Sequence, residues 1–237
     1  MLTKWLKEQT YFKGMIDFIF PPLCAGCGKF ESSPSHICNK CLSQIQTFDK
    51  PICLNCEAEI NSPSGCQHCN ENQFPLYVYG DYHPVLKEII IQYKFKNVLA
   101  PVDLLVDLFF KKFGDEINKI KPTVLVPIPL HPIREHQRGY NQALILAEKL
   151  SLLSEIKIST ELIYRVKKRK PQAKLDFKQR RKNIDGVFEA DDSHDKKESI
   201  LLIDDVVTTG ATVKEAKKIL EAARHEVVGA AALAHGK

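Results

Sequence analysis

"ILLIDDVVTTGAT", residues 200–212, is the stretch that decides the fold. Its first half is almost wholly apolar, which is typical of a β-strand covered on both faces in a parallel sheet. This strand, residues 200–204, ends in two adjacent carboxylates, Asp204 and Asp205. Ligands of open parallel sheets bind just beyond the carboxyl ends of the strands. The stretch therefore predicts a parallel α/β sheet with two acidic side chains at its ligand-binding edge.

A short loop and the start of a helix follow the two acids. Free backbone N–H groups and the helix dipole at such a helix start favour an anion. Hydroxyl donors, and a glycine that permits close approach of the backbone, add to this environment; they are Thr208, Thr209, Thr212 and Gly210. Carboxylates beside an anion site suit a ligand with hydroxyls next to a phosphate, such as a ribose 5-phosphate. The alternative is a capped strand–helix turn with no ligand, and Thr212 and Glu215 have the spacing of a capping box.

The chain after residue 70 alternates between strand and helix patterns. Strands are predicted at residues 76–82, 123–130, 200–204 and 227–234. Helices are predicted at residues 84–95, 101–113, 141–153 and 212–224. This alternation predicts a doubly wound, mostly parallel α/β sheet. The tyrosines of this region could stack on bases, but their strand and helix spacing favours core packing.

All eight cysteines lie in four CxxC pairs between residues 24 and 69. Two such pairs complete a tetrahedral four-thiolate site, so the spacing predicts two structural zinc ions in a small N-terminal zinc-ribbon module. Disulfides, a redox CxxC and an iron–sulfur cluster are the weaker alternatives, and interleaved pairing of the motifs stays open. The simplest pairing joins Cys24, Cys27, Cys38 and Cys41 in one site and Cys53, Cys56, Cys66 and Cys69 in the other.

The length of 237 residues is comfortable for two domains, and no apolar run approaches the roughly 18 residues of a membrane span. Residues 1–23 have the pattern of an amphipathic helix that packs on its own domain or lies on a membrane surface, without the features of a secretory signal. We expect three parts: the amphipathic segment 1–23, a double four-cysteine module 24–70 and the α/β domain 71–237. A cytoplasmic location follows, with peripheral membrane contact at most.

Positive charge is concentrated between residues 165 and 182, where ten basic residues and one acidic residue give a net charge of +9, against +5 for the whole chain. Three interpretations compete: a solvated linker, a flexible loop that closes over a polyanionic ligand, and a contact for single-stranded nucleic acid. The last two are compatible. The basic side chains in question are Arg165, Lys167, Lys168, Arg169, Lys170, Arg180 and Arg181.

The 13-residue stretch at 200–212 resembles the signature of type I phosphoribosyltransferases, which bind phosphoribosyl pyrophosphate (PRPP). The resemblance implies that Asp204 and Asp205 hold the ribose hydroxyls. It also implies a divalent cation, usually Mg²⁺, with PRPP, which suits the preference of that ion for oxygen ligands. The 5-phosphate would be held by the loop of Val207, Thr208, Thr209, Gly210, Ala211 and Thr212.

A second stretch, "VPIPLHPIREHQRGYNQA" at residues 126–143, extends the resemblance. Together with the CxxC pairs and "FPP" at residues 20–22, it is similar to the ComF family of competence proteins. The family implies a role in the uptake of single-stranded DNA, with a helicase-like partner as one possibility. The pyrophosphate loop would contain Pro127, Ile128 and Pro129. Arg134, Arg138 and Asn141 follow it and either reach phosphates or, for Arg138 and Asn141, hold the loop by hydrogen bonds.

Two functions of different classes follow from these features. The first is a binding protein of DNA uptake whose PRPP-type fold senses a phosphorylated ligand while the basic segment contacts single-stranded DNA. The second is an active phosphoribosyltransferase, in which Mg²⁺ and basic groups stabilise the departing pyrophosphate. The sequence provides no separate segment to select the phosphoribosyl acceptor, apart from the cysteine module. An intact signature indicates ligand binding without establishing turnover.

Overall fold

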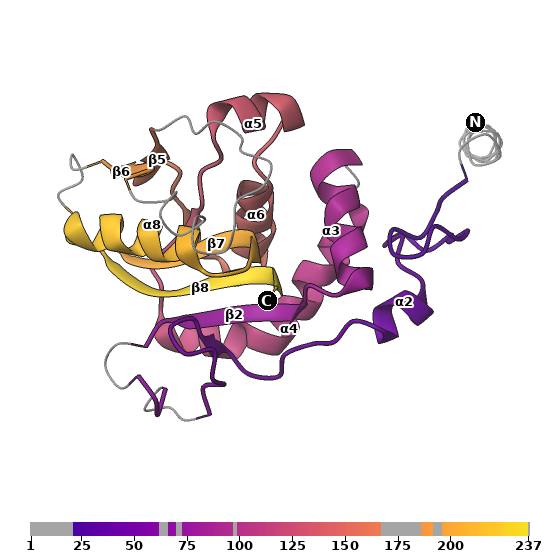
Figure 1. Cartoon of the computed structure of the whole chain (residues 1–237), viewed down its shortest axis with the longest axis horizontal. Coiled ribbons are helices and arrows are strands. Elements are labelled where there is room, and N and C mark those ends of the chain that lie inside the picture. The colour runs from indigo at the N-terminus through magenta and orange to yellow at the C-terminus, as the bar shows by residue number, and fades with distance from the viewer. Residues whose placement is uncertain are drawn as a thin grey trace, which may run out of the picture.

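The central element of the fold is a six-stranded sheet with the strand order β1-β2-β8-β7-β3-β4 (Figure 1). The computed structural model describes residues 21–61, 66–69, 73–96, 99–166, 186–191 and 196–236. Neighbouring strands from β2 to β4 are parallel, and β1 pairs with β2 in the antiparallel sense. The doubly wound, mostly parallel sheet that the sequence predicts is confirmed.

The strands of the large sheet are short at its edges and long at its centre. They are β1 (Ile52–Cys53), β2 (Pro75–Asp81), β3 (Val124–Pro127), β4 (Lys157–Ile158), β7 (Ser199–Val207) and β8 (Glu226–His235). A separate antiparallel pair is formed by β5 (Ile163–Arg165) and β6 (Phe188–Ala190). The helices are α2 (Asn39–Ser43), α3 (Pro84–Lys96), α4 (Ala100–Ile120), α5 (Pro132–Arg138), α6 (Gln142–Ser154) and α8 (Ala211–Ala222).

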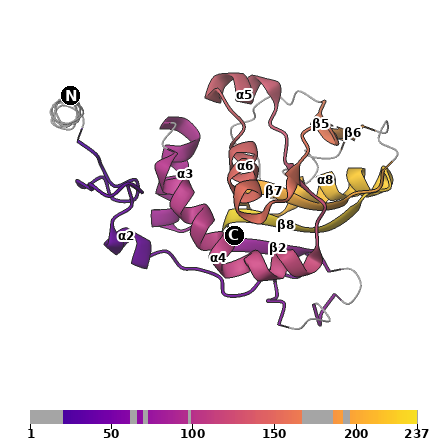
Figure 2. The ribbon, with the colours of Figure 1, turned by 180° about the vertical axis from the view of Figure 1, so that it is seen from behind.

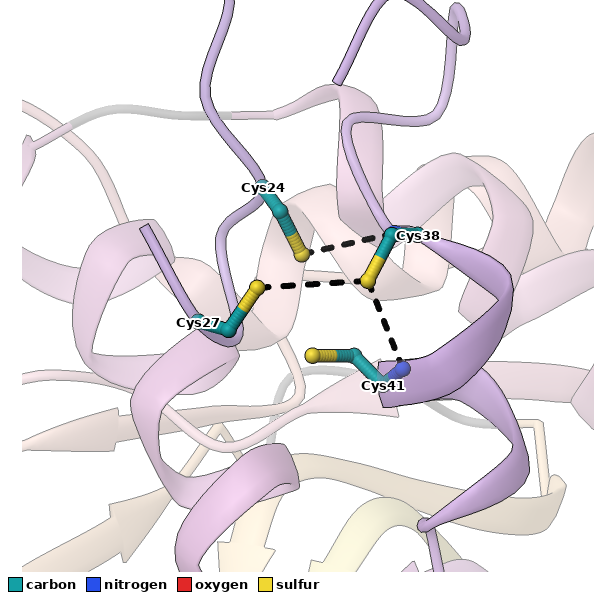
Figure 3. A group of neighbouring side chains, drawn as sticks. All are labelled: Cys24, Cys27, Cys38 and Cys41. Carbon is teal, nitrogen blue, oxygen red and sulfur yellow. Dashed lines mark hydrogen bonds between the residues drawn. The ribbon is translucent and has the colours of Figure 1, made fainter. Parts of the chain in front are cut away.

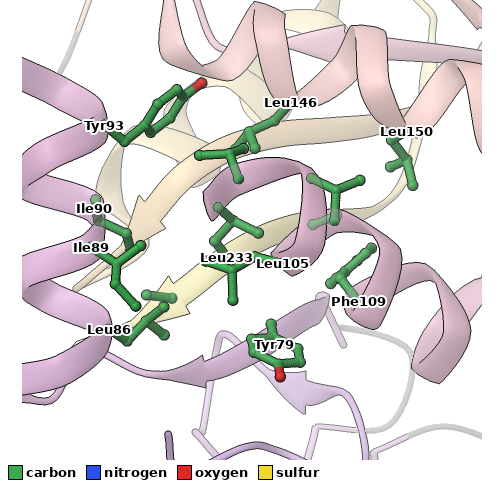
Figure 4. Packing of buried hydrophobic residues seen from close by; sticks show 14 of the residues in the cluster. Tyr79, Leu86, Ile89, Ile90, Tyr93, Leu105, Phe109, Leu146, Leu150 and Leu233 are labelled. Carbon is green, nitrogen blue, oxygen red and sulfur yellow. The ribbon is translucent and has the colours of Figure 1, made fainter. Parts of the chain in front are cut away.

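Two apolar cores lie on the two faces of the sheet. The first core packs α3, α4 and α6 against one face, with Tyr93, Leu105 and Phe109 among its buried side chains (Figure 4). The second core packs α8 and the β5–β6 pair against the other face (Figures 1 and 2). From Ile200 to Ile203, successive residues of β7 alternate between the cores, because side chains alternate across a strand: Ile203 lies in the first and Leu202 in the second.

Several boundaries differ from those that the sequence predicts. The strand expected to end at Asp204 continues to Val207, because Val206 and Val207 pair with Ala234 and His235 of β8. Helix α4 continues past the expected end at Phe113 to Ile120, because Ile117 is fully buried and extends the apolar face. The sequence analysis did not predict α5, and the short strands β1, β4, β5 and β6 carried too few residues to give a periodic signal.

The cysteine-containing region is continuous with the sheet. A segment preceding β1 runs along β2, with Phe48 N–H donating to the Tyr79 carbonyl at 3.1 Å and Asp81 N–H donating to Gln46 at 2.8 Å. Lys112 of α4 forms an ion pair with Asp49 at 2.9 Å. The proposed division at residues 23 and 70 stays a prediction, and the amphipathic helix predicted within 1–23 falls almost wholly outside the described residues. Among the described residues, no helix combines the length and apolar content needed to cross a membrane.

Candidate functional site

The loop between β7 and α8 consists of Thr208, Thr209 and Gly210, and we call it the β7–α8 loop. Gly210 is the N-cap of α8 and has a φ of 68°, a left-handed conformation that glycine adopts without strain. The N-cap residue has no side chain to accept a helix N–H, and Thr209 Oγ1 accepts the Ala211 N–H at 3.3 Å. The predicted capping box is wrong, because the Glu215 carboxylate instead accepts the Gly186 N–H at 2.8 Å. The start of α8 is thus open to an anion.

The six residues expected to form a 5-phosphate loop therefore divide among three elements. Val207 is buried in the last position of β7 and pairs with β8, while Ala211 and Thr212 are half-buried in the first turn of α8. Thr208 is exposed and Gly210 is buried. The backbone reverses within three residues, so the hydroxyls and the helix N–H groups gather at one place. Their role in phosphate binding stays a prediction.

The two acids of β7 have different surroundings. Asp205 is 7% exposed and faces the first core, where its Oδ1 lies 2.8 Å from Nζ of Lys94 on α3. The negative charge of Asp205 contributes to the raised pKa of the buried Tyr93, second to burial itself. Asp205 is thus an ion-paired group beneath α3, and a shared grip of both acids on a ribose stays a prediction.

The ionised form of the Asp204 side chain is destabilised by its surroundings, and the neighbouring Asp205 adds to this effect. Burial and the neighbouring Asp205 charge raise the pKa of Asp204 from 3.8 to about 7, against the opposing effects of Lys94, the Asp205 N–H and Arg165. The Asp205 N–H donates to Asp204 Oδ1 at 2.8 Å. A carboxyl group in this condition gains from any hydroxyl donor or cation that approaches it.

Arg165 is the described end of the basic segment. It terminates β5, its guanidinium carbon lies 5.4 Å from the centre of the Phe188 ring, and its charge acts on Asp204. The β5–β6 pair therefore holds one basic group near the carboxyl end of β7. The other basic side chains named above, Lys167, Lys168, Arg169, Lys170, Arg180 and Arg181, lie outside the described residues.

The end of β3 lies beside β7 at the same edge of the sheet. Pro127 is level with Ile203, and the Ile128 N–H donates to the Ile203 carbonyl at 2.8 Å. Pro127 and Ile128 are buried and Pro129 is half-buried. The parallel pairing thus brings the predicted pyrophosphate loop next to Asp204.

The side chain of Asn141 fixes this loop to α6. Its Oδ1 accepts the Ala143 N–H at 3.0 Å as the N-cap of α6, and its Nδ2 donates to the Ile128 carbonyl at 3.1 Å. Arg138 donates to Gln142 Oε1 at 2.8 Å and lies over the Phe95 ring. The Asn141 contact favours the interpretation in which this residue holds the loop, whereas the contacts of Arg138 are to Gln142 and Phe95, and its role stays a prediction. Arg134 is exposed on α5.

Lys94 is the site residue that the sequence analysis missed. It lies between the buried Tyr93 and the exposed Phe95 on α3 and is only 17% exposed in its side chain. The available signal was a lysine inside the apolar run "EIIIQYKF", where a buried cation requires an acidic partner. The sequence could not identify Asp205 as that partner, because the pairing depends on how α3 packs against β7.

The cysteines form two clusters with sequential pairing. The first cluster contains Cys24, Cys27, Cys38 and Cys41 (Figure 3), and the second contains Cys53, Cys56, Cys66 and Cys69. All four sulfurs of each cluster lie within 4.8 Å of one another, with Cys27–Cys38 at 3.9 Å and Cys56–Cys66 at 3.4 Å. A tetrahedral zinc site with Zn–S bonds of about 2.3 Å places its sulfurs about 3.8 Å apart. Both clusters therefore fit zinc.

Backbone N–H groups prepare one cysteine in each cluster for a metal. Burial opposes ionisation of Cys24, but N–H groups led by that of Cys38 lower its pKa to about 6. Burial likewise opposes ionisation of Cys53, and N–H groups near it lower its pKa to about 7. Burial and the other thiols raise the pKa of Cys41. A bound cation would resolve this conflict by stabilising all four thiolates together.

Two known families match different parts of the chain. A family described as "Double zinc ribbon domain" matches residues 15–70, and one described as "Phosphoribosyl transferase domain" matches residues 102–237. The fold and the two cysteine clusters thus define a protein with a phosphoribosyltransferase-type α/β domain and a double zinc ribbon. A purine phosphoribosyltransferase structure from Pyrococcus horikoshii aligns with 56% of this chain and 71% of its own at 18% identity and a TM-score of 0.35.

Individual relatives identify the family to which this chain belongs. Competence protein F of Haemophilus influenzae is 31% identical over 83% of this chain and 90% of its own length. Competence protein ComFC of Bacillus subtilis is 28% identical over 78% of this chain and 77% of its own length. DNA utilization protein YhgH of Escherichia coli K12 is 28% identical over 78% of this chain and 83% of its own length. The chain belongs to the ComF family of competence proteins.

We expect metal-loaded protein to contain two zinc ions per chain, one in each closed four-thiolate cluster. Cys27→Ser and Cys56→Ser each remove one exposed ligand from a different cluster. Elemental analysis after gel filtration should therefore give one tightly bound ion for each variant and none for the double variant. Loss of both ions from either single variant would contradict two independent sites.

We expect Asp204→Asn to change how stability depends on pH. Because the folded-state pKa of Asp204 is raised to about 7, the folded state binds this proton more tightly than the unfolded state does. Its contribution favours folding at low pH and is lost as pH rises from about 4 to about 7. Thermal melting across this range should show the variant gaining stability over the wild type as pH increases. Asp81→Asn, at the end of β2, is the control, and parallel curves for wild type and Asp204→Asn would contradict the raised pKa.

Proposed function

We propose that this protein binds PRPP with Mg²⁺ at the carboxyl edge of its sheet and acts in DNA uptake or DNA utilisation by contacting single-stranded DNA. The uncapped start of α8 directly after the acidic end of β7 carries the PRPP part of the proposal. The membership of the ComF family supports the DNA part, since its relatives are named for competence and DNA utilisation.

The chemistry of the edge matches the three parts of PRPP. The first N–H groups of α8 and the β7–α8 loop suit the 5-phosphate, because helix starts bind anions. Asp204 is half-buried with a raised pKa, so ribose hydroxyls that donate to it would relieve its strain. The backbone after Pro127, which Asn141 holds in place, suits the pyrophosphate.

Mg²⁺ fits the same edge because it requires oxygen ligands and a local excess of negative charge. When bound, it would neutralise pyrophosphate charge. Such a cation would stabilise the carboxylate of Asp204, because the carboxylate of Asp205 is already paired with Lys94. In this proposal the ion pair with Lys94 holds the Asp205 carboxylate in position beside Asp204.

The basic segment supports the DNA part of the proposal. Its net charge of +9 between residues 165 and 182 suits a phosphate backbone. Its first residue, Arg165, lies at the end of β5 and its charge acts on Asp204, so the segment begins near the proposed PRPP site. The proposal includes a cytoplasmic location, where PRPP and Mg²⁺ are available, and a helicase-like partner acting on the same strand.

We expect PRPP with Mg²⁺ to bind the wild type with micromolar to millimolar affinity by isothermal titration calorimetry. Asp204→Asn combined with Asp205→Asn should abolish binding while the protein stays folded, because both charges of the β7 pair are removed. Asp81→Asn removes a carboxylate from the same edge outside the loop and should keep the wild-type affinity. Unchanged affinity in the double variant would reject the role of the acids in ribose binding.

We expect single-stranded DNA to bind with a strong dependence on salt, which fluorescence anisotropy measures. Each lost phosphate contact reduces the slope of log affinity against log salt by about 0.7, so neutralising four charges should make it shallower by up to about 3. The variant changes Lys167, Lys168, Arg169 and Lys170 to glutamine. A matched control changes four exposed lysines elsewhere, namely Lys87, Lys111, Lys119 and Lys218. Equal slopes for both variants would reject the basic segment as the DNA contact.

A further inference from the structure

The second cysteine cluster contacts the β7–α8 loop through Leu54, which lies between its ligands Cys53 and Cys56. The Leu54 side chain covers Gly210 so closely that a Cβ atom added to this glycine would lie 2.9 Å from Leu54 Cδ2. Leu54 is 5% exposed, and Gly210 is buried. The inner side of the loop is thus packed against the cluster, while Thr208 on the outer side is exposed.

Local structure around the cluster holds Leu54 in this position. Its backbone N–H donates to the Phe74 carbonyl at 2.8 Å, and Cys53 pairs with Pro75 of β2. The Phe74 ring in turn lies 5.1 Å from Nζ of Lys217, two turns further along α8. Leu54 and Phe74 therefore contact α8 at two places, at its N-cap Gly210 and at Lys217 in its middle.

Leu54 shares the second core with residues on both sides of the loop. Val207 precedes the loop, Val213 follows it, and both are almost fully buried in this core. A loop of three residues between two buried anchors has little freedom except at its centre, where Gly210 meets Leu54. The position of Leu54 therefore influences where the first N–H groups of α8 point.

We infer that Leu54 positions the β7–α8 loop, so that zinc in the second cluster and phosphate bound at the loop strengthen each other. The inference rests on the proposed function and extends it to a named positioning residue. Zinc fixes the turn from Cys53 to Cys56 and thereby holds Leu54 on Gly210. By linkage, a ligand that requires the same loop position must raise the zinc affinity of this cluster by the same factor.

The first cluster provides an internal control because it packs elsewhere. A Cβ atom added to Gly26, between Cys24 and Cys27, would lie 3.2 Å from Val85 on α3, and this cluster belongs to the first core. Its ribbon lies beside α3 (Figure 1). Leu42 follows Cys41 as Leu54 follows Cys53, and it packs against the first core. Leu42→Ala is thus the matched truncation at the other cluster.

The test measures PRPP affinity with Mg²⁺ by calorimetry on zinc-loaded full-length protein. We expect Leu54→Ala to weaken PRPP binding about 5-fold or more, a typical coupling between sites, while Leu42→Ala retains the wild-type affinity. Leu54→Met, which keeps the side-chain volume, should restore most of the affinity. Zinc content and thermal melting establish that each variant is folded and holds two ions.

The reciprocal measurement leaves Leu54 unchanged, so it does not depend on whether Leu54→Ala folds. Chelator competition at equilibrium, with and without saturating PRPP, should show one of the two zinc ions held about 5-fold or more tighter when PRPP is present. The Cys27→Ser variant, which retains the second cluster, should show the same shift, and Cys56→Ser should show none.

The outcomes separate the inference from the proposed function. Wild-type protein that does not bind PRPP would refute the proposed function and the inference with it. Wild-type protein that binds PRPP without any change in zinc affinity would refute the inference alone. Folded, zinc-loaded Leu54→Ala with the affinity of Leu42→Ala would do the same.

Discussion

The pairing of β7 between β3 and β8 is the constraint on which the rest of the structure depends. Because all three strands are parallel, their carboxyl ends and the loops that follow them lie at one edge. β7 pairs with β8 as far as His235, whereas its pairing with β3 is complete at Ile203. Its last residues therefore project past β3 and carry Asp204 and Asp205 into the space beside the loop after Pro127.

Two adjacent carboxylates on a buried strand cost free energy of folding, and the fold gives a cationic partner to only one of them. Asp205 Oδ1 forms an ion pair with Nζ of Lys94 on α3 at 2.8 Å. Asp204 remains half-buried with a pKa raised by burial and by its neighbour, with Arg165 as a partial compensation. Strain of this kind persists where a site is preorganised for a ligand rather than for stability. Of the two acids, Asp204 is therefore the one whose surroundings raise its pKa, while Asp205 has a cationic partner.

The sequence predicted those features whose partners lie nearby in the chain. The CxxC spacing predicted both clusters because a turn of four residues supplies two ligands, and the apolar runs predicted the central strands. Features that depend on distant partners were missed. Val206 and Val207 are strand residues only because β8 reaches His235, Lys94 acquires its role from β7, and the contact of Leu54 with Gly210 joins opposite ends of the chain.

The two cysteine clusters pack against two different parts of the α/β domain. The first cluster packs on α3 near Val85, and α3 carries the lysine that pairs with Asp205. The second cluster places Leu54 on Gly210, at the start of α8. A zinc ribbon has little core of its own, so its metal fixes the surface that it presents to a neighbour. The second cluster contacts the β7–α8 loop, so under the proposed coupling its metal acts on that loop through the packing of Leu54 on Gly210, whereas the first cluster packs against α3.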